Sequence, residues 1–103
     1  MASIKIEIQY FHGCPNSQKM IERVMQAVIG YEKDIEISEV LVEDNSTAEK
    51  VKFRGSPTVL INGIDLVNEP EPEQPALACR YYSNGLPDVN SIKSILVRHS
   101  RHQ

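Results

Sequence analysis

Apolar and polar residues alternate at the start of the chain, and this pattern predicts the first strand, over Ile4 to Phe11. Every second residue from Ile4 to Tyr10 is isoleucine or tyrosine, with charged or amide side chains between them. A period of two is typical of a strand with one buried face. A central strand covered on both faces would be mostly apolar. The alternation therefore also predicts a sheet face that is poorly covered, or covered by a partner chain.

A helix and a second strand are predicted next. From Pro15 to Val28 apolar residues recur every three to four positions, and Gly30 follows, which is typical of an amphipathic helix with a glycine stop. Proline suits the first helical position because its missing N–H would have no partner there. The segment from Ile35 to Val42 predicts the second strand. Two strands joined through a helix normally lie parallel.

A short helix and a hairpin are predicted in the second half of the chain. Ser46 to Glu49 has the spacing of a capping box, which predicts a helix that begins there and continues through Phe53. The pair Asn62-Gly63 separates Thr58–Ile61 from Ile64–Val67 and is a strong signal for two antiparallel strands.

The order of the elements predicts a single α/β domain over residues 1–103. A final helix is expected from about Asp88 to His99, where apolar residues recur at helical spacing. The predicted order is strand-helix-strand-helix-strand-strand-helix, and its parallel and antiparallel pairs make a four-stranded mixed sheet. A chain of 103 residues with 41% apolar and 24% charged residues fits one compact domain.

An irregular segment is expected between residues 68 and 87. Its prolines and Gly85 leave room for at most one helical turn, around Ala76 to Tyr82. Long irregular segments in compact domains are usually functional or disordered. This one carries Cys79 in a stretch that is apolar enough to pack back on the domain, with Tyr81 and Tyr82 expected in the core or at its rim.

Composition and charge narrow the function classes. Eleven basic and fourteen acidic residues give a net charge of −3, which argues against the basic face that binds nucleic acid. No apolar run approaches the ~18–20 residues that span a bilayer, and the first residues lack the apolar core of a signal peptide. Two cysteines do not suggest the disulfide framework of a secreted domain, nor, with three histidines, a zinc site. We expect a cytoplasmic protein without a cofactor that binds neither nucleic acid nor membrane.

Cys14 is the residue whose surroundings point most clearly to chemistry. It follows the first predicted strand and precedes Pro15, so its sulfur is expected at a helix N-terminus. There the helix dipole and the free N–H groups favour the thiolate, which is both the nucleophile and the soft-metal ligand. The alternative is a thiol that only packs at the helix start. His12 could assist the thiolate or be a solvated loop residue, and Ser17 could donate its hydroxyl to the thiolate or have no special role.

Two motifs together resemble the thioredoxin-like superfamily along nearly the whole chain. Gly13-Cys14-Pro15-Asn16-Ser17 stands where that superfamily has its active-site motif, and Ser56-Pro57-Thr58 is similar to its cis-proline element. With the Asn-Gly hairpin and the late Cys79, they resemble small bacterial thioredoxin-like proteins in particular. The resemblance implies that Pro57 follows a cis peptide and lies against the Cys14 thiol. It also implies that Pro15, Ser56, Pro57 and Thr58 bind substrate, and that the backbone beside Pro57 pairs with an extended peptide or glutathione.

Ser17 departs from the Cys-x-x-Cys motif of thioredoxins. No disulfide can form within the motif, and a Cys-x-x-Ser motif alone stops at a mixed disulfide. Either glutathione or Cys79 must then resolve it. Cys79 could instead be a small buried apolar residue, because sequence separation does not give distance. Its neighbour Arg80 could stabilise a thiolate if the two side chains converge, or could be a solvated charge.

Three functions fit these residues. The first is thiol–disulfide exchange with protein thiols, protein disulfides or glutathione, in which Cys14 is the nucleophile, Cys79 or glutathione resolves, and Ser17 and His12 assist. The second is a soft-metal or metalloid site made by the thiolates of Cys14 and Cys79. The third is a non-catalytic module that associates with a partner or a second copy through the exposed sheet face.

Overall fold

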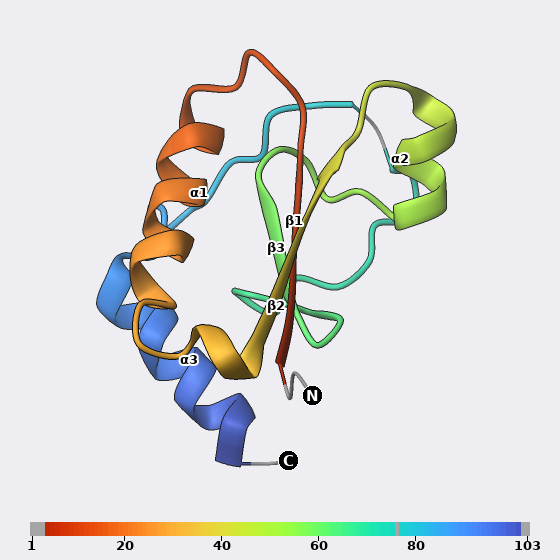
Figure 1. The fold of residues 1–103 in the computed structure, drawn as a ribbon. Helices are drawn as coiled ribbons and strands as arrows, with labels where there is room; N and C mark the ends of the chain where they lie inside the picture. The colour runs from red at the N-terminus through yellow and green to blue at the C-terminus, as the bar shows by residue number, and fades with distance from the viewer. Residues whose placement is uncertain (1–3, 76, 102–103) are drawn as a thin grey trace.

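Four strands form one mixed sheet, with helices on both of its sides (Figure 1). The computed structural model describes residues 4–75 and 77–101. β1 is parallel to β2 and antiparallel to β3, and β3 is antiparallel to β4. The predicted α/β fold with a four-stranded mixed sheet is confirmed. In sheet order the strands are β2 (Ile35–Leu41), β1 (Ile4–Tyr10), β3 (Thr58–Ile61) and β4 (Ile64–Asp65).

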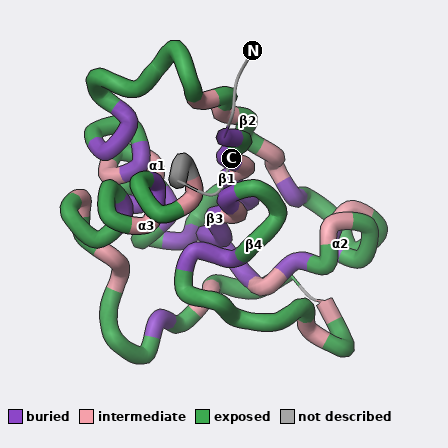
Figure 2. The backbone as a smooth tube through the Cα atoms, turned by 90° about the horizontal axis from the view of Figure 1, so that it is seen from below, coloured by how far each residue is buried: buried purple, intermediate pink, exposed green. Residues whose placement is uncertain are grey.

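The main core lies between the sheet and two helices, α1 (Pro15–Ala27) and α3 (Val89–Arg101). The alternation in β1 turns its isoleucines toward these helices, where Ile6 and Ile8 are fully buried. The apolar stripes of α1 and α3 meet them, and the buried positions gather on this side in Figure 2. No helix in the described ranges is long and apolar enough to cross a membrane.

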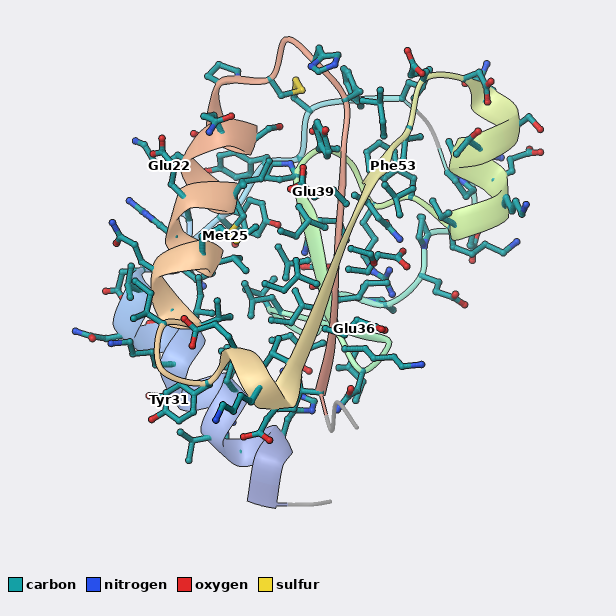
Figure 3. All side chains as sticks on the ribbon, viewed as in Figure 1. Glu22, Met25, Tyr31, Glu36, Glu39 and Phe53 are labelled. Carbon is teal, nitrogen blue, oxygen red and sulfur yellow. A yellow bond between two sulfur atoms is a disulfide. The ribbon has the colours of Figure 1, made fainter. Side chains whose placement is uncertain are left out.

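A second, smaller cluster lies on the opposite side of the sheet, under α2 (Asn45–Val51). Phe53 is its largest buried side chain, and Figure 3 shows it between α2 and the sheet. Phe11 packs against this cluster and makes an edge contact with Phe53. Beyond α2 the same face is open and forms a hollow lined mainly by polar residues, among them Lys5, Glu7, Glu36 and Ser38. This is the exposed face that the alternation in β1 predicts.

The structure shifts several predicted boundaries. The capping box at Ser46 is wrong, because α2 begins one residue earlier and Asp44 is its cap: the Asp44 carboxylate accepts a hydrogen bond from the Thr47 backbone N–H. The helix stops before Phe53 because Lys52 adopts a left-handed conformation, with φ of 55°. The first strand ends at Tyr10, the second at Leu41 and the fourth at Asp65, each one or two residues earlier than predicted.

The segment from residue 68 to 87 is irregular, as predicted. Ala76 lies outside the described residues, and residues 77–82 contain no helical turn. The segment crosses from the side of α2 to the side of α1 and α3 (Figure 1). On this path Cys79 forms an isolated parallel β-bridge with Ser56, and Ser56 lies shortly before the first residue of β3. Ser56 and the start of α1 thus meet the irregular segment at one end of the sheet.

Candidate redox site

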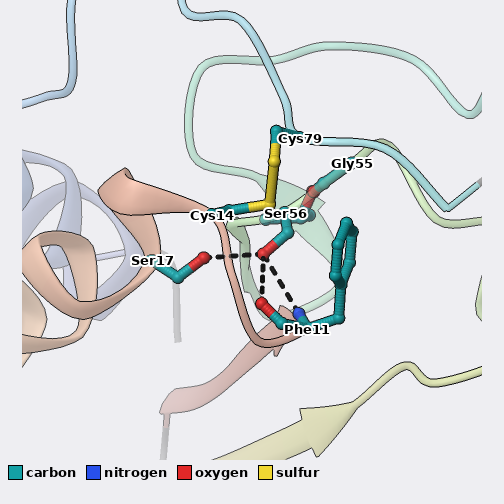
Figure 4. Close-up of a disulfide and its surroundings, with 7 residues drawn as sticks. Phe11, Cys14, Ser17, Gly55, Ser56 and Cys79 are labelled. Carbon is teal, nitrogen blue, oxygen red and sulfur yellow. Dashed lines mark hydrogen bonds between the residues drawn. A yellow bond between two sulfur atoms is a disulfide. The ribbon is translucent and has the colours of Figure 1, made fainter.

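A disulfide joins Cys14 and Cys79, which are 65 residues apart in the sequence (Figure 4). Their Cα atoms are 5.7 Å apart, which is within the ordinary range for a disulfide. Cys14 is the N-cap of α1, in an extended backbone conformation, and Pro15 follows at the first helical position. The structure therefore brings together the two cysteines whose proximity the sequence leaves open.

Cys14 lies at the buried end of the site. It is only 6% exposed, and its carbonyl accepts a hydrogen bond from the Ser17 N–H at 3.1 Å. The Ser17 hydroxyl lies 2.7 Å from the Ser56 hydroxyl, and both side chains are buried. The Ser56 Oγ also accepts a hydrogen bond from the Phe11 N–H at 3.1 Å. In the disulfide form Ser17 is thus engaged with Ser56, and it joins α1 to the loop before β3.

His12 lies at the rim of the same site. It is exposed, and its ring meets the Tyr10 ring edge-on, with centroids 5.9 Å apart. Together with Tyr10, Cys14 and Ser17 it lines a hollow beside the start of α1. The structure therefore places His12 near the cysteine pair, packed on a neighbouring ring.

The backbone of Ser56 is paired with the segment that carries Cys79. The Ser56 N–H donates to the Ala78 carbonyl, and the Arg80 N–H donates to the Ser56 carbonyl, each at 2.9 Å. The peptide bond between Ser56 and Pro57 is cis. Ser56, Pro57 and Thr58 are all buried, whereas Pro15 is exposed. The backbone expected to pair with a substrate is therefore occupied by the protein's own chain.

Gly55 makes this pairing sterically feasible. Its φ is +106°, and a Cβ added there would lie 2.9 Å from the Arg80 Cβ and 3.2 Å from the Ala78 carbonyl oxygen. Contacts below 3.0 Å require a shift of one partner, and here the partners are backbone atoms or a Cβ fixed to the backbone. A side chain at position 55 would push the Cys79 segment away from Ser56.

A buried ion pair between Arg80 and Asp65 also holds the segment that carries Cys79. The two guanidinium nitrogens of Arg80 donate to the two carboxylate oxygens of Asp65 at 2.7 and 2.8 Å. The side chains of Arg80 and Asp65 are 6% and 1% exposed. The guanidinium also lies over the Tyr82 ring, 4.5 Å from its centroid. Both sequence interpretations of Arg80 are wrong, because it is directed at Asp65, not at a thiolate or at solvent.

Asp65 is a buried residue of this site that the sequence interpretation missed. Besides Arg80, it accepts hydrogen bonds from the backbone N–H groups of Val67 and Glu69. Burial alone would raise the pKa of the carboxyl group, but the hydrogen bonds and positive charge of Arg80, with those two N–H groups, lower it. The available signal was a single charged residue within the otherwise uncharged stretch from Thr58 to Val67.

The two neighbouring tyrosines differ in role. Tyr82 is buried, and its hydroxyl donates to the Pro57 carbonyl at 2.6 Å. Burial raises the pKa of Tyr82 to about 12. Tyr82 therefore attaches the irregular segment to the same loop that Ser56 occupies. Tyr81 is 85% exposed, so the prediction that it packs in the core or at its rim is wrong.

The order and pairing of the strands and helices define the class: the chain has a thioredoxin-like fold. Two solved structures are similar to it, each with a TM-score of 0.62. One, described as a malarial protein, is 14% identical, and the alignment covers 93% of this chain and 96% of that one. The other, thioredoxin-2, described as a component of the protein secretion machinery of the malaria parasite, is 13% identical, with 93% and 82% covered. No protein-family model and no curated protein matches the chain.

We expect Gly55→Ala to loosen the Cys79 segment. The positive φ costs an alanine about 1–2 kcal/mol, and the clash with Arg80 and Ala78 adds about 1–3 kcal/mol. Gly30→Ala is the matched control, because Gly30 has a similar φ of +93° and nothing within 4 Å of an added Cβ. Urea unfolding of both variants measures the difference. Equal destabilisation would show that the close approach at Gly55 is unimportant.

We expect Asp65→Asn to lower the free energy of unfolding at pH 7 by about 3–5 kcal/mol, because it leaves the Arg80 charge buried and unpaired. The pKa of Asp65 is lowered by folding, so its contribution is fully present above the unfolded pKa of ~3.9 and is lost as pH falls through the folded-state pKa. The Asp65→Asn variant should not show this loss of unfolding free energy as pH falls. Urea unfolding between pH 7 and pH 2 tests both points. The control Glu71→Gln changes an exposed carboxylate of the same segment and should leave the curve unchanged.

Proposed function

We propose that this protein is a thiol–disulfide oxidoreductase whose active pair is Cys14 and Cys79. The observation that supports this most directly is the disulfide itself, at the N-terminus of a 13-residue helix and beside a cis Ser56–Pro57 peptide. Two cysteines 65 residues apart become neighbours only because the irregular segment returns to Ser56. A fold that positions its two thiols in this way is suited to reversible oxidation.

The surroundings of Cys14 suit the chemistry of exchange. The dipole and the free N–H groups at the start of α1 stabilise a Cys14 thiolate, which is the reactive form. Ser17 occupies the place of the second motif cysteine, and Cys79 supplies the missing thiol from the irregular segment. In one cycle two external thiols reduce the protein disulfide and leave as one external disulfide. The proposed partners are glutathione or protein thiols, and the proposed compartment is the cytoplasm, where disulfides are usually transient and catalytic.

Binding of a soft metal or metalloid ion is the second candidate. Once reduced, the two sulfurs lie close enough to bind one ion, and thiolates prefer soft ions. The described residues contain no group of three or more histidine, cysteine, aspartate or glutamate side chains that could hold a metal. A site here would therefore consist of the two thiolates alone. Stoichiometric binding that both Cys14→Ser and Cys79→Ser abolish would support this candidate.

We expect the wild-type protein to equilibrate with glutathione between a dithiol and an intramolecular disulfide. The measurement is the fraction oxidised across a series of ratios of reduced to oxidised glutathione, followed by alkylation and mass spectrometry. The control Cys79→Ser should stop at the mixed disulfide with glutathione. If wild type and control behave alike, or if neither thiol reacts, thiol–disulfide exchange is wrong and a non-catalytic role in association becomes the better account.

A further inference from the structure

We infer that the external thiol enters at Cys79 and that Cys14 is the resolving thiol. This assignment rests on the proposed function and reverses the order that the sequence suggests, in which Cys14 meets the substrate. It follows from three features of the site: the unequal exposure of the two cysteines, the occupied backbone of Ser56, and the different leaving groups.

The two cysteines are unequally exposed. Cys14 is 6% exposed. Cys79 is exposed, as are the neighbouring residues Ala78 and Tyr81. A hollow beside Cys79 is lined by Arg54 and by residues of the irregular segment, among them Glu69 and Tyr81. An attacking thiolate must approach in line with the disulfide bond, and Cys79 is the residue that presents the larger surface to solvent.

The occupied backbone of Ser56 closes the alternative approach to Cys14. An extended peptide that paired with Ser56 would have to displace Ala78 and Arg80 from its N–H and carbonyl groups. The Arg80 side chain opposes this displacement through its two hydrogen bonds to the buried Asp65 carboxylate. Breaking the disulfide alone removes neither set of contacts. The attacking thiol therefore does not pair with the Ser56 backbone, and glutathione is small enough to reach Cys79 without that pairing.

The leaving groups favour the same order. Attack on Cys79 expels Cys14, whose thiolate forms at the N-terminus of α1 and is stabilised there. Attack on Cys14 would expel Cys79, which lies in an irregular segment and whose neighbour Arg80 is already paired with Asp65. Because a thiol with a lower pKa leaves faster, expulsion of Cys14 is the easier step.

The cycle is balanced with two external thiols. The first thiolate attacks the Cys79 sulfur, so that a bond between the external sulfur and Cys79 forms, the bond between the two cysteines breaks, and the electron pair stays on Cys14. A second external thiolate attacks the external sulfur of this mixed disulfide and leaves as the external disulfide. Cys79 is then a thiolate, and both protein thiols take up protons from solvent according to their pKa values. In the oxidising direction the Cys79 thiolate attacks the external disulfide and expels one external thiolate. The Cys14 thiolate then attacks the Cys79 sulfur of the mixed disulfide, which forms the bond between the two cysteines and expels the second external thiolate.

The test is to map the mixed disulfide that forms when the oxidised protein meets reduced glutathione. The reaction is quenched at early times with acid, and glutathione is located on Cys79 or Cys14 by peptide mass spectrometry after pepsin digestion. We expect at least about tenfold more on Cys79. The same experiment in urea is the control, because unfolding removes both the difference in exposure and the helix, and the preference should disappear.

In the wild-type intermediate, the Cys14 thiolate can attack the glutathione sulfur and transfer the glutathione from Cys79 to Cys14. Variants with a single cysteine exclude this transfer and give a second measurement. The reduced variants Cys14→Ser and Cys79→Ser are each exposed to oxidised glutathione, and the first should be glutathionylated faster. Glutathione found mainly on Cys14, together with a faster Cys79→Ser variant, would overturn the inference and leave the proposed function intact. A wild-type disulfide that glutathione never reduces would refute both.

Discussion

The ion pair between Arg80 and Asp65 is the interaction on which the candidate site depends. It joins the irregular segment to the end of β4, with both side chains almost fully buried and two short hydrogen bonds between them. A buried ion pair contributes little net stability, since desolvation offsets its attraction, but losing one partner is costly. Its effect here is positional. Arg80 follows Cys79 directly, so fixing the guanidinium also fixes the cysteine beside Ser56.

Three contacts act together around this pair. The backbone of Ser56 donates one hydrogen bond to the Cys79 segment and accepts one from it. Gly55 has no side chain and so leaves space for this close approach. The Tyr82 hydroxyl donates to the Pro57 carbonyl. The result is a thioredoxin-like fold in which the loop before β3 already holds an extended segment of the same chain. A second cysteine outside the Cys-x-x-Ser segment is thereby held against the helix start. This arrangement explains how a Cys-x-x-Ser motif can still take part in an intramolecular disulfide.

Local patterns carry much of the fold and part of the site. Alternation identified β1, the Asn-Gly pair identified the hairpin, and Pro15 after a strand placed Cys14 at a helix start, because each feature follows from neighbouring residues. The predicted cap of α2 was wrong for a local reason too, since Asp44 and Ser46 are both favoured N-cap residue types and it is the Asp44 carboxylate that accepts the Thr47 N–H. The contacts of Cys79 and Arg80 could not be predicted in this way. They join positions 65 and 15 residues apart, and only the tertiary fold determines which of the alternatives is realised.

Arg80 and Asp65, and not the disulfide, keep the Cys79 segment on Ser56. Amide hydrogen exchange of the fully reduced protein tests this most directly, at the N–H groups of Ser56 and Arg80. The N–H of Leu66, which donates to Val59 within the hairpin, serves as the internal reference. We expect that reduction changes the protection of both amides by less than about tenfold relative to Leu66. Exchange of both amides at the rate of an unstructured chain, with Leu66 still protected, would contradict it.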